Sequence, residues 1–292
     1  MAEEYTLESV RATAVGKELP QEELERFHAG YEDVRMIPTR KEDARVYYFA
    51  PGTEGPYPVV INLHGGGFVK GRRDQDTVFC RNLVENAGVC VVDIDYHTAP
   101  EKMYPYALNE CYDVAKYVAQ HPEEFHADPT KIVLMGHSAG ANLVFGLQFL
   151  ALEEGIFQPA LLVSEYPPLD FTQDPEDARY AHAPFTRIPP EKARKYNGWY
   201  VDKKYIREIT ASPIFASKSE LAGFAPVLLI LAELDTLTPN AVRFAAKLID
   251  AGVTVTAKTV KGANHSFTIQ RRPGFDVAEA LIFEALNKIK QQ

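Results

Sequence analysis

The chain has 292 residues, 46% of them hydrophobic and 24% charged, so it can bury a large core as one domain with an added cap. Its formal net charge is −9, and an acidic surface repels phosphate backbones and anionic lipids, which disfavours nucleic-acid and membrane-surface roles. The three cysteines, Cys80, Cys90 and Cys111, form no CxxC pair, and their odd number argues against a disulfide framework.

The first segment of the chain is polar and acidic. It lacks the apolar stretch of a secretory signal, and no run of about 18 apolar residues occurs in the chain, so we expect a cytoplasmic protein. Leu19, Leu24 and Phe27 are spaced for an amphipathic helix. Two short strand-like runs follow, Asp33–Ile37 and Ala44–Phe49.

Apolar strands then alternate with helix-length segments, which is typical of a parallel sheet covered on both faces. The predicted strands are Pro58–Leu63, Val89–Asp95, Lys131–Met135, Ala160–Ser164, Pro226–Ala232 and Val253–Val260. The predicted helices are Asp74–Ala87, Tyr106–Gln120, Ser138–Glu153, Pro239–Ala251 and Asp276–Ile289.

One stretch interrupts this alternation. Between Asp170 and Ser212 about 40 residues pass without a strand, and structureless loops of that length are rare inside compact domains. We therefore expect a helical insertion over one edge of the sheet, which forms a cap together with the N-terminal helix. Its aromatic residues favour a modest apolar pocket, with ordinary core packing as the alternative.

Residues 136–140 read GHSAG, the G-x-S-x-G pattern of a nucleophilic serine at Ser138. The pattern alone is a modest signal, but it directly follows an apolar strand and directly precedes a helical segment. A strand-to-helix turn this tight forces strained backbone angles on the central residue and needs small neighbours, because the chain nearly collides with itself. The structural alternative is a serine helix cap in a tight turn.

Residues 64–68 read HGGGF and follow another apolar strand. Three consecutive glycines are unfavourable in conformational entropy, so we infer that bare backbone is needed there. We interpret the loop as an oxyanion hole, in which N–H groups of Gly66 and Gly67 converge with that of Ala139. A flexible hairpin is one alternative; a phosphate loop is another, but residues 68–71 lack its Lys-Ser/Thr pattern.

A nucleophilic serine requires a base, because its hydroxyl is scarcely ionised near pH 7. His265 follows the last predicted strand and precedes the last helix. Enzymes that carry a G-x-S-x-G serine on a parallel sheet covered by helices place their histidine in this loop. The acid is expected at the end of the preceding strand, where Asp235 begins a loop and would fix the tautomer of His265. Glu233 is the rival for this role, and a turn former or helix cap is the alternative role for Asp235.

Asp93 and Asp95 end a predicted strand and could suggest a glycosidase or a metal pair. A structural turn is favoured, because no companion carboxylate cluster is present in the sequence. There is no HExxH motif and no GxGxxG after a strand, so we predict neither a metal nor a cofactor.

Together these motifs resemble the hormone-sensitive-lipase-like family of α/β-hydrolases, including its HGGG-type bacterial carboxylesterases, over roughly residues 57–265. The resemblance rests on HGGGF at 64–68, DYHTAPE at 95–101, GHSAGAN at 136–142, EYPPLD at 165–170 and the loops of Asp235 and His265. It implies a single α/β-hydrolase domain over residues 1–292, with a mostly parallel eight-stranded sheet, helices on both faces and a helical cap. The cap would comprise about residues 1–30 and 171–210, and the oxyanion donors would be Gly66, Gly67 and Ala139.

The sequence departs from the family pattern at a few positions. The residue before the serine is usually Asp and is His137 here, and Ala141 replaces a second glycine after the pentapeptide. His97 and Thr98 replace Arg and Leu, and Ser266 replaces the glycine after the base. No catalytic side chain is lost, so these changes affect the subfamily and the substrate rather than the reaction type.

We predict a serine carboxylesterase that hydrolyses small or medium acyl esters, aromatic ones included, through an acyl-enzyme. The candidate substrate-binding residues are Phe68, His137, Trp199 and Tyr200. We expect a small-molecule ester as the ligand, no nucleic-acid partner and no membrane, and we leave a homodimer open.

Other functions compete with this one. A hydrolase of acyl-amino acids or short peptides usually carries a propeller domain, for which this chain has no room, and a lipase needs a more apolar lid. A catalytically idle small-molecule binder is a further alternative, because plant hormone receptors of this fold have lost catalytic residues. A scaffold that binds partners through its cap is the last.

Overall fold

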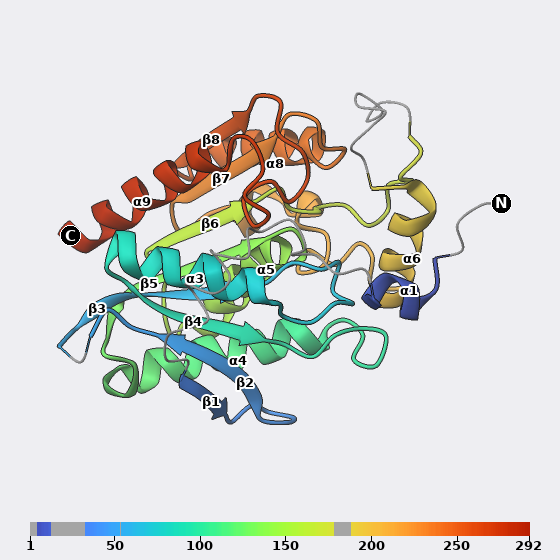
Figure 1. The fold of residues 1–292 in the computed structure, drawn as a ribbon. Coiled ribbons are helices and arrows are strands. Elements are labelled where there is room, and N and C mark those ends of the chain that lie inside the picture. Colours follow the sequence, from blue (N-terminus) through green and yellow to red (C-terminus); the bar gives the residue numbers. More distant parts are fainter. Residues whose placement is uncertain (1–4, 13–32, 53, 178–187) are drawn as a thin grey trace.

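The computed structural model describes residues 5–12, 33–52, 54–177 and 188–292. Its centre is an eight-stranded sheet in the order β1-β2-β4-β3-β5-β6-β7-β8 (Figure 1). The strands are β1 Asp33–Ile37, β2 Ala44–Phe49, β3 Tyr57–Leu63, β4 Cys90–Asp95, β5 Ala127–His137, β6 Leu161–Glu165, β7 Val227–Ala232 and β8 Val255–Val260. Strand β2 pairs antiparallel with both β1 and β4, and the strands from β4 to β8 pair in parallel. The predicted α/β-hydrolase fold is confirmed.

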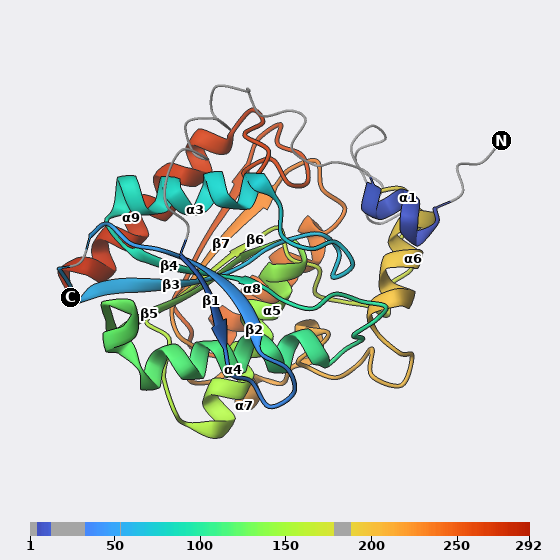
Figure 2. The same cartoon turned by 60° about the horizontal axis from the view of Figure 1, so that its bottom comes forward.

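Helices cover both faces of the sheet (Figures 1 and 2). Helices α3 and α9 pack on one face, and α4, α5 and α8 pack on the other. The helices are α1 Leu7–Ala12, α3 Asp74–Ala87, α4 Tyr106–Gln120, α5 Ala139–Glu154, α6 Pro190–Tyr200, α7 Lys218–Leu221, α8 Thr238–Asp250 and α9 Phe275–Gln291, with 3₁₀ turns at η1 Pro122–Phe125 and η3 Pro213–Phe215.

The central strands are apolar on both sides because each face lies under helices. In β7, Val227, Leu229 and Leu231 join the core under α4, α5 and α8. The alternate residues, such as Leu228 and Ile230, join the core under α3 and α9. This period of two explains why the strand has an uninterrupted apolar run rather than alternating polarity.

Most predicted boundaries agree with the structure. Helices α3 and α4 have the predicted bounds, whereas β5 begins at Ala127 instead of Lys131. The prediction excluded the segment before Lys131 because it contains Pro129. In the structure this segment extends β5 past a register irregularity, and Ala127 pairs with Tyr57.

Two described segments lie at the end of the sheet where the parallel strands terminate. Helices α1 and α6 lie side by side there in both views (Figures 1 and 2). Arg11 of α1 donates to the carbonyl oxygens of Val69 and Ala99 and pairs with Glu101 at 2.6 Å, which ties α1 to two loops at this end. The helix predicted around Leu19, Leu24 and Phe27 lies outside the described residues, as do residues 178–187 of the cap.

The three cysteines are buried and free. In the described part of the chain, no helix has both the length and the apolarity needed to cross a membrane.

Candidate active site

Ser138 lies in a sharp turn between β5 and α5, with φ 56° and ψ −117°. A side chain rarely adopts a positive φ, and close packing of the backbone explains why it persists here. A Cβ on Gly140 would lie 1.8 Å from the Leu63 carbonyl oxygen, and one on Gly136 would lie 2.5 Å from the Gly140 carbonyl carbon. The Ser138 N–H donates to the Glu165 carbonyl oxygen at 2.9 Å, which anchors the turn to β6.

The structure brings together three side chains that are far apart in the sequence. Ser138 Oγ lies 2.8 Å from His265 Nε2, and His265 Nδ1 lies 2.6 Å from Asp235 Oδ2. The Asp235 side chain is 1% exposed and that of His265 is 12% exposed, so the pair is largely shielded from water. This is the hydrogen-bonding order in which a carboxylate orients an imidazole and the imidazole takes a proton from a hydroxyl.

Local contacts hold the side chains of Asp235 and His265 in place. Asp235 follows β7, and its second oxygen, Oδ1, accepts a hydrogen bond from the Leu237 N–H at 3.0 Å. His265 lies in the loop after β8, where the Tyr166 ring packs edge-on against it at 5.1 Å between centroids. Burial raises the pKa of Tyr166 well above its ordinary value, so its phenol is neutral. Glu233 instead accepts from the Gly262 N–H at 2.8 Å, so the structure places it on the loop backbone and not on His265.

The glycine loop after β3 packs directly against the serine turn. A Cβ on Gly65 would lie 3.4 Å from Ser138 Cβ. Gly66 and Gly67 have φ of 121° and 62°, values that favour glycine. No carbonyl in the described part of the chain accepts a hydrogen bond from the amides of Gly66, Gly67 or Ala139, the first residue of α5. These amides are therefore available to a negatively charged oxygen at Ser138, as is the positive end of the α5 dipole.

A cavity of about 100 Å³ opens beside Ser138. Its apolar walls come from the glycine loop, the segment after β6, helix α6 of the predicted cap and the loop before α8. Its lining includes Phe68, Leu169, Asp170, Tyr196, Leu237 and Asn240.

Of the four predicted substrate-binding residues, Phe68 lines this cavity, whereas His137, Trp199 and Tyr200 are absent from its described lining. Tyr200 is 1% exposed and stacks on the far side of Phe68, with 3.5 Å between ring centroids. The structure also contradicts a substrate contact for His137, because it is 1% exposed and bonded to Asp76. Trp199 packs against the core beside Tyr196.

Most of the cavity wall was not predicted from the sequence. The predicted cap residues share aromatic character, whereas the rotation of α6 decides which side chains reach the cavity. Ala193, Tyr196 and Asn197 line the cavity, at the spacing of three and four residues that defines one helix face. The spacing is only a partial signal, because Tyr200 follows Tyr196 by four residues and is nevertheless buried against Phe68 instead of lining the cavity.

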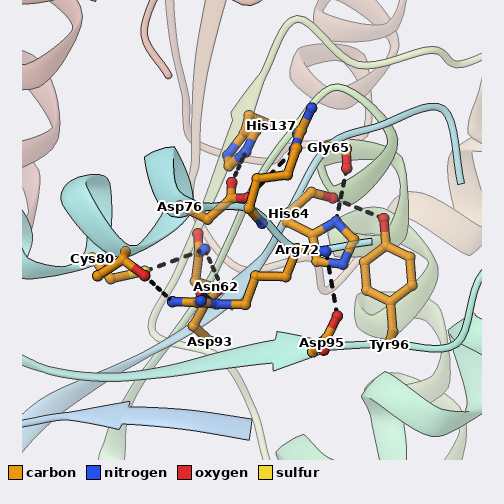
Figure 3. A network of polar contacts seen from close by, with 12 residues as sticks. Asn62, His64, Gly65, Arg72, Asp76, Cys80, Asp93, Asp95, Tyr96 and His137 are labelled. Atoms are coloured by element: carbon orange, nitrogen blue, oxygen red, sulfur yellow. Dashed lines mark hydrogen bonds and ion pairs between the residues drawn. The ribbon is translucent and has the colours of Figure 1, made fainter. Parts of the chain in front are cut away.

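A buried polar network lies near the glycine loop, at the ends of β3 and β4 (Figure 3). Asp93 accepts hydrogen bonds from Asn62 Nδ2 at 2.7 Å and from Arg72 Nε at 2.5 Å. Asp95 accepts from the Arg72 N–H at 3.3 Å. Their carboxylates are satisfied by structural partners, which confirms the structural role predicted for both.

Among the described residues, one group has the ligand types and spacing that a metal ion could use: His121, Glu123 and Glu124. It lies at η1, next to the start of β5, whereas Ser138 follows the end of that strand. It therefore takes no part in the arrangement around the serine.

Comparison with known proteins identifies the family. A family model described as "alpha/beta hydrolase fold" matches residues 60–269. The chain belongs to the α/β-hydrolase family, in its hormone-sensitive-lipase-like branch of carboxylesterases.

Among curated α/β-hydrolases, the chain is 28% identical to the carboxylesterase NlhH of Mycobacterium tuberculosis, over 81% of this chain and 73% of that protein. It is 29% identical to an ethyl acetate hydrolase of Pseudomonas putida, over 78% of this chain and 72% of that protein. Its fold matches the thermostable carboxylesterase EstE1, cloned from a metagenomic library, with a TM-score of 0.87, 26% identity and 99% of each chain covered. These similarities support a hydrolase that acts on carboxylic ester bonds.

Proposed function

We propose that this protein is a serine carboxylesterase in which Ser138 is the nucleophile, His265 the base and Asp235 the acid. The proposal rests on the two hydrogen bonds that link Ser138 Oγ to His265 and His265 to Asp235, at 2.8 and 2.6 Å. Ser138 also lines a cavity and lies beside backbone amides that no carbonyl engages, and acyl transfer requires this combination.

The proposed reaction has two steps. His265 Nε2 takes the proton of Ser138 as its oxygen attacks the ester carbonyl, and the amides of Gly66, Gly67 and Ala139 receive the oxyanion. The intermediate collapses to an acyl-enzyme as the imidazolium returns its proton to the departing alcohol. Water, deprotonated by His265, then attacks the acyl-enzyme and releases the carboxylic acid and free Ser138.

Cavity size favours esters with short acyl groups. A volume of about 100 Å³ accommodates a few carbon atoms beside Ser138 rather than an extended lipid chain. The similarity to an ethyl acetate hydrolase agrees with this size class. A cytoplasmic location and a homodimer stay predictions.

Replacement of the nucleophile tests the proposal. The Ser138→Ala variant is expected to fold normally and to lose hydrolysis of p-nitrophenyl acetate and labelling by a fluorophosphonate. An idle binder would show neither activity in the unmodified protein. Undiminished hydrolysis by the Ser138→Ala variant would refute the assignment of the nucleophile.

A further inference from the structure

His137 precedes the nucleophile but points away from the substrate cavity. Its ring is buried, and Nε2 lies 3.1 Å from Asp76 Oδ1 in the first turn of α3 (Figure 3). The Phe79 ring packs edge-on against it at 5.8 Å between centroids. The imidazole is therefore fixed between the serine turn and α3.

Asp76 is a fully buried anion. Burial raises the pKa of its carboxyl group, but the hydrogen bond from His137 and the nearby charge of Arg73 outweigh burial, so the net pKa lies well below its ordinary value. The Arg73 backbone N–H also donates to Asp76 Oδ2 at 2.8 Å. A carboxylate accepts only, so the proton between the two side chains resides on His137 Nε2.

The His137 ring also contacts the glycine loop. A Cβ on Gly65 would lie 3.1 Å from His137 Cδ2, which is tighter than ordinary contact and shows that the ring packs on the loop backbone. His64, at the start of the loop, bonds through Nδ1 to the Gly65 carbonyl oxygen at 2.7 Å. One side chain therefore touches the loop that carries the Gly66 and Gly67 amides while its own backbone leads into Ser138.

We propose that His137, held by Asp76, is a positioning residue that sets the separation between the glycine loop and the serine turn. That separation decides whether the loop amides and the Ala139 amide can bond the same oxyanion. Loss of one such donor lowers turnover by about 100- to 1000-fold, so a partial displacement is expected to lower it by about 10- to 100-fold. The inference rests on the proposed esterase function.

A second imidazole–carboxylate pair provides a matched control. His97 Nδ1 lies 2.6 Å from Glu110 Oε1, and the His97 ring packs against Tyr106. This pair has the same chemistry as His137–Asp76, but it joins the loop after β4 to α4 rather than supporting the serine turn. Its loss removes this hydrogen bond and a 3.5 Å pairing with Glu42, and we expect it to leave the oxyanion amides in place.

The experiment compares His137→Ala, His137→Gln, Asp76→Asn and His97→Ala, using p-nitrophenyl acetate and a trifluoromethyl ketone, which adds reversibly to the serine as an oxyanion. We expect His137→Ala to lower kcat by about 10- to 100-fold, with KM within about threefold. Ki for the ketone should weaken by the same factor as kcat/KM. His137→Gln should recover most of the loss, because its amide can still donate to Asp76, and His97→Ala should change neither constant.

Two results would overturn the inference: kcat within twofold of the unmodified protein in His137→Ala, or a fall in kcat without a matching rise in Ki. If His137→Ala does not fold, kcat and Ki are compared in the same way for Asp76→Asn. An unchanged Ki for the ketone in Asp76→Asn would reject the positioning role of His137. Failure of the proposed function would look different, because the unmodified protein would then neither hydrolyse the ester nor react with a fluorophosphonate.

Discussion

Two glycines hold Ser138 in a backbone conformation that a serine rarely adopts. The missing Cβ atoms of Gly136 and Gly140 allow the chain to fold back to within contact of itself and of Leu63. Strain of this kind persists only where the surroundings enforce it. The fixed turn in return leaves Ser138 Oγ within 2.8 Å of His265.

The Gly140→Ala substitution is expected to lower the free energy of unfolding by at least about 3 kcal/mol, because the new Cβ meets backbone that no side-chain rotation can move. Gly198 is the matched control, since it lies in α6 and a Cβ there meets nothing within 4 Å. Gly198→Ala should stabilise the protein by about 0.5–1 kcal/mol. Urea unfolding of both variants checks this, and equal midpoints would contradict the packing argument.

Glu165 is a buried acid beside the same turn. Its side-chain oxygens have no hydrogen-bond partner among the described residues, although the Thr268 hydroxyl is near enough to favour ionisation weakly. Burial raises the pKa of Glu165 from its ordinary 4.5 to about 7; the charge of His137 lowers it and that of Glu279 raises it. Glu165 is therefore protonated in the folded protein at mildly acidic pH.

The raised pKa predicts how stability depends on pH. Between 4.5 and about 7 the folded state binds a proton that the unfolded state has released, so the contribution of Glu165 to stability falls as pH rises. The difference between the pKa of Glu165 in the folded state and its ordinary value corresponds to roughly 3 kcal/mol in the free energy of unfolding. Glu165→Gln should therefore become progressively more stable than the unmodified protein across this window. Denaturation curves from pH 4 to 8 test this, and a constant difference would contradict it.

At the scale of elements, the sequence was sufficient wherever local pattern decides structure. The bounds of α3 and α4 followed from periodicity and flanking turn residues, and the serine, histidine and aspartate followed from where their loops lie relative to strands. The rotation of α6 about its axis and the interior position of His137 could not be predicted, because both depend on contacts with distant segments such as Gly67 and Asp76.

Helix α6 supplies one wall of the cavity through Tyr196. A Cβ on Gly67 would lie 2.7 Å from Tyr196 Cδ1, so this ring covers the glycine loop directly. Tyr196→Ala should raise activity on p-nitrophenyl hexanoate relative to the acetate by about tenfold, because burial of about two of the four added methylenes, at about 0.8 kcal/mol each, corresponds to roughly that factor. Trp199→Ala, which removes a neighbouring aromatic ring that does not line the cavity, should leave the ratio within about twofold. Equal changes in both variants would show that the cavity wall is assigned wrongly.

At the scale of the whole molecule, the order of strands gathers the proposed catalytic groups at one end of the sheet. The loops after β3, β5, β7 and β8 carry the glycine loop, Ser138, Asp235 and His265, and these strands run parallel to their neighbours in the sheet. Carboxyl ends of parallel strands meet at one edge, so residues separated by long stretches of chain become neighbours.

The net charge of −9 also acts on the whole molecule. It should attract cationic esters and repel anionic ones, and salt should screen both effects. We expect kcat/KM for acetylthiocholine to fall severalfold as the salt concentration rises from about 20 to about 200 mM. The kcat/KM for its neutral dimethylbutyl analogue should stay constant over the same range. Identical salt responses for the two substrates would remove the electrostatic argument.

The most direct test of the account asks which carboxylate orients His265. Asp235→Asn should lower kcat by at least about 100-fold, and by up to about 10⁴-fold, because an amide holds the imidazole in the wrong tautomer. Glu233→Gln should leave kcat within about threefold, since the Glu233 carboxylate bonds the Gly262 N–H instead. A large loss in Glu233→Gln, with Asp235→Asn nearly as active as the unmodified protein, would contradict the proposed arrangement.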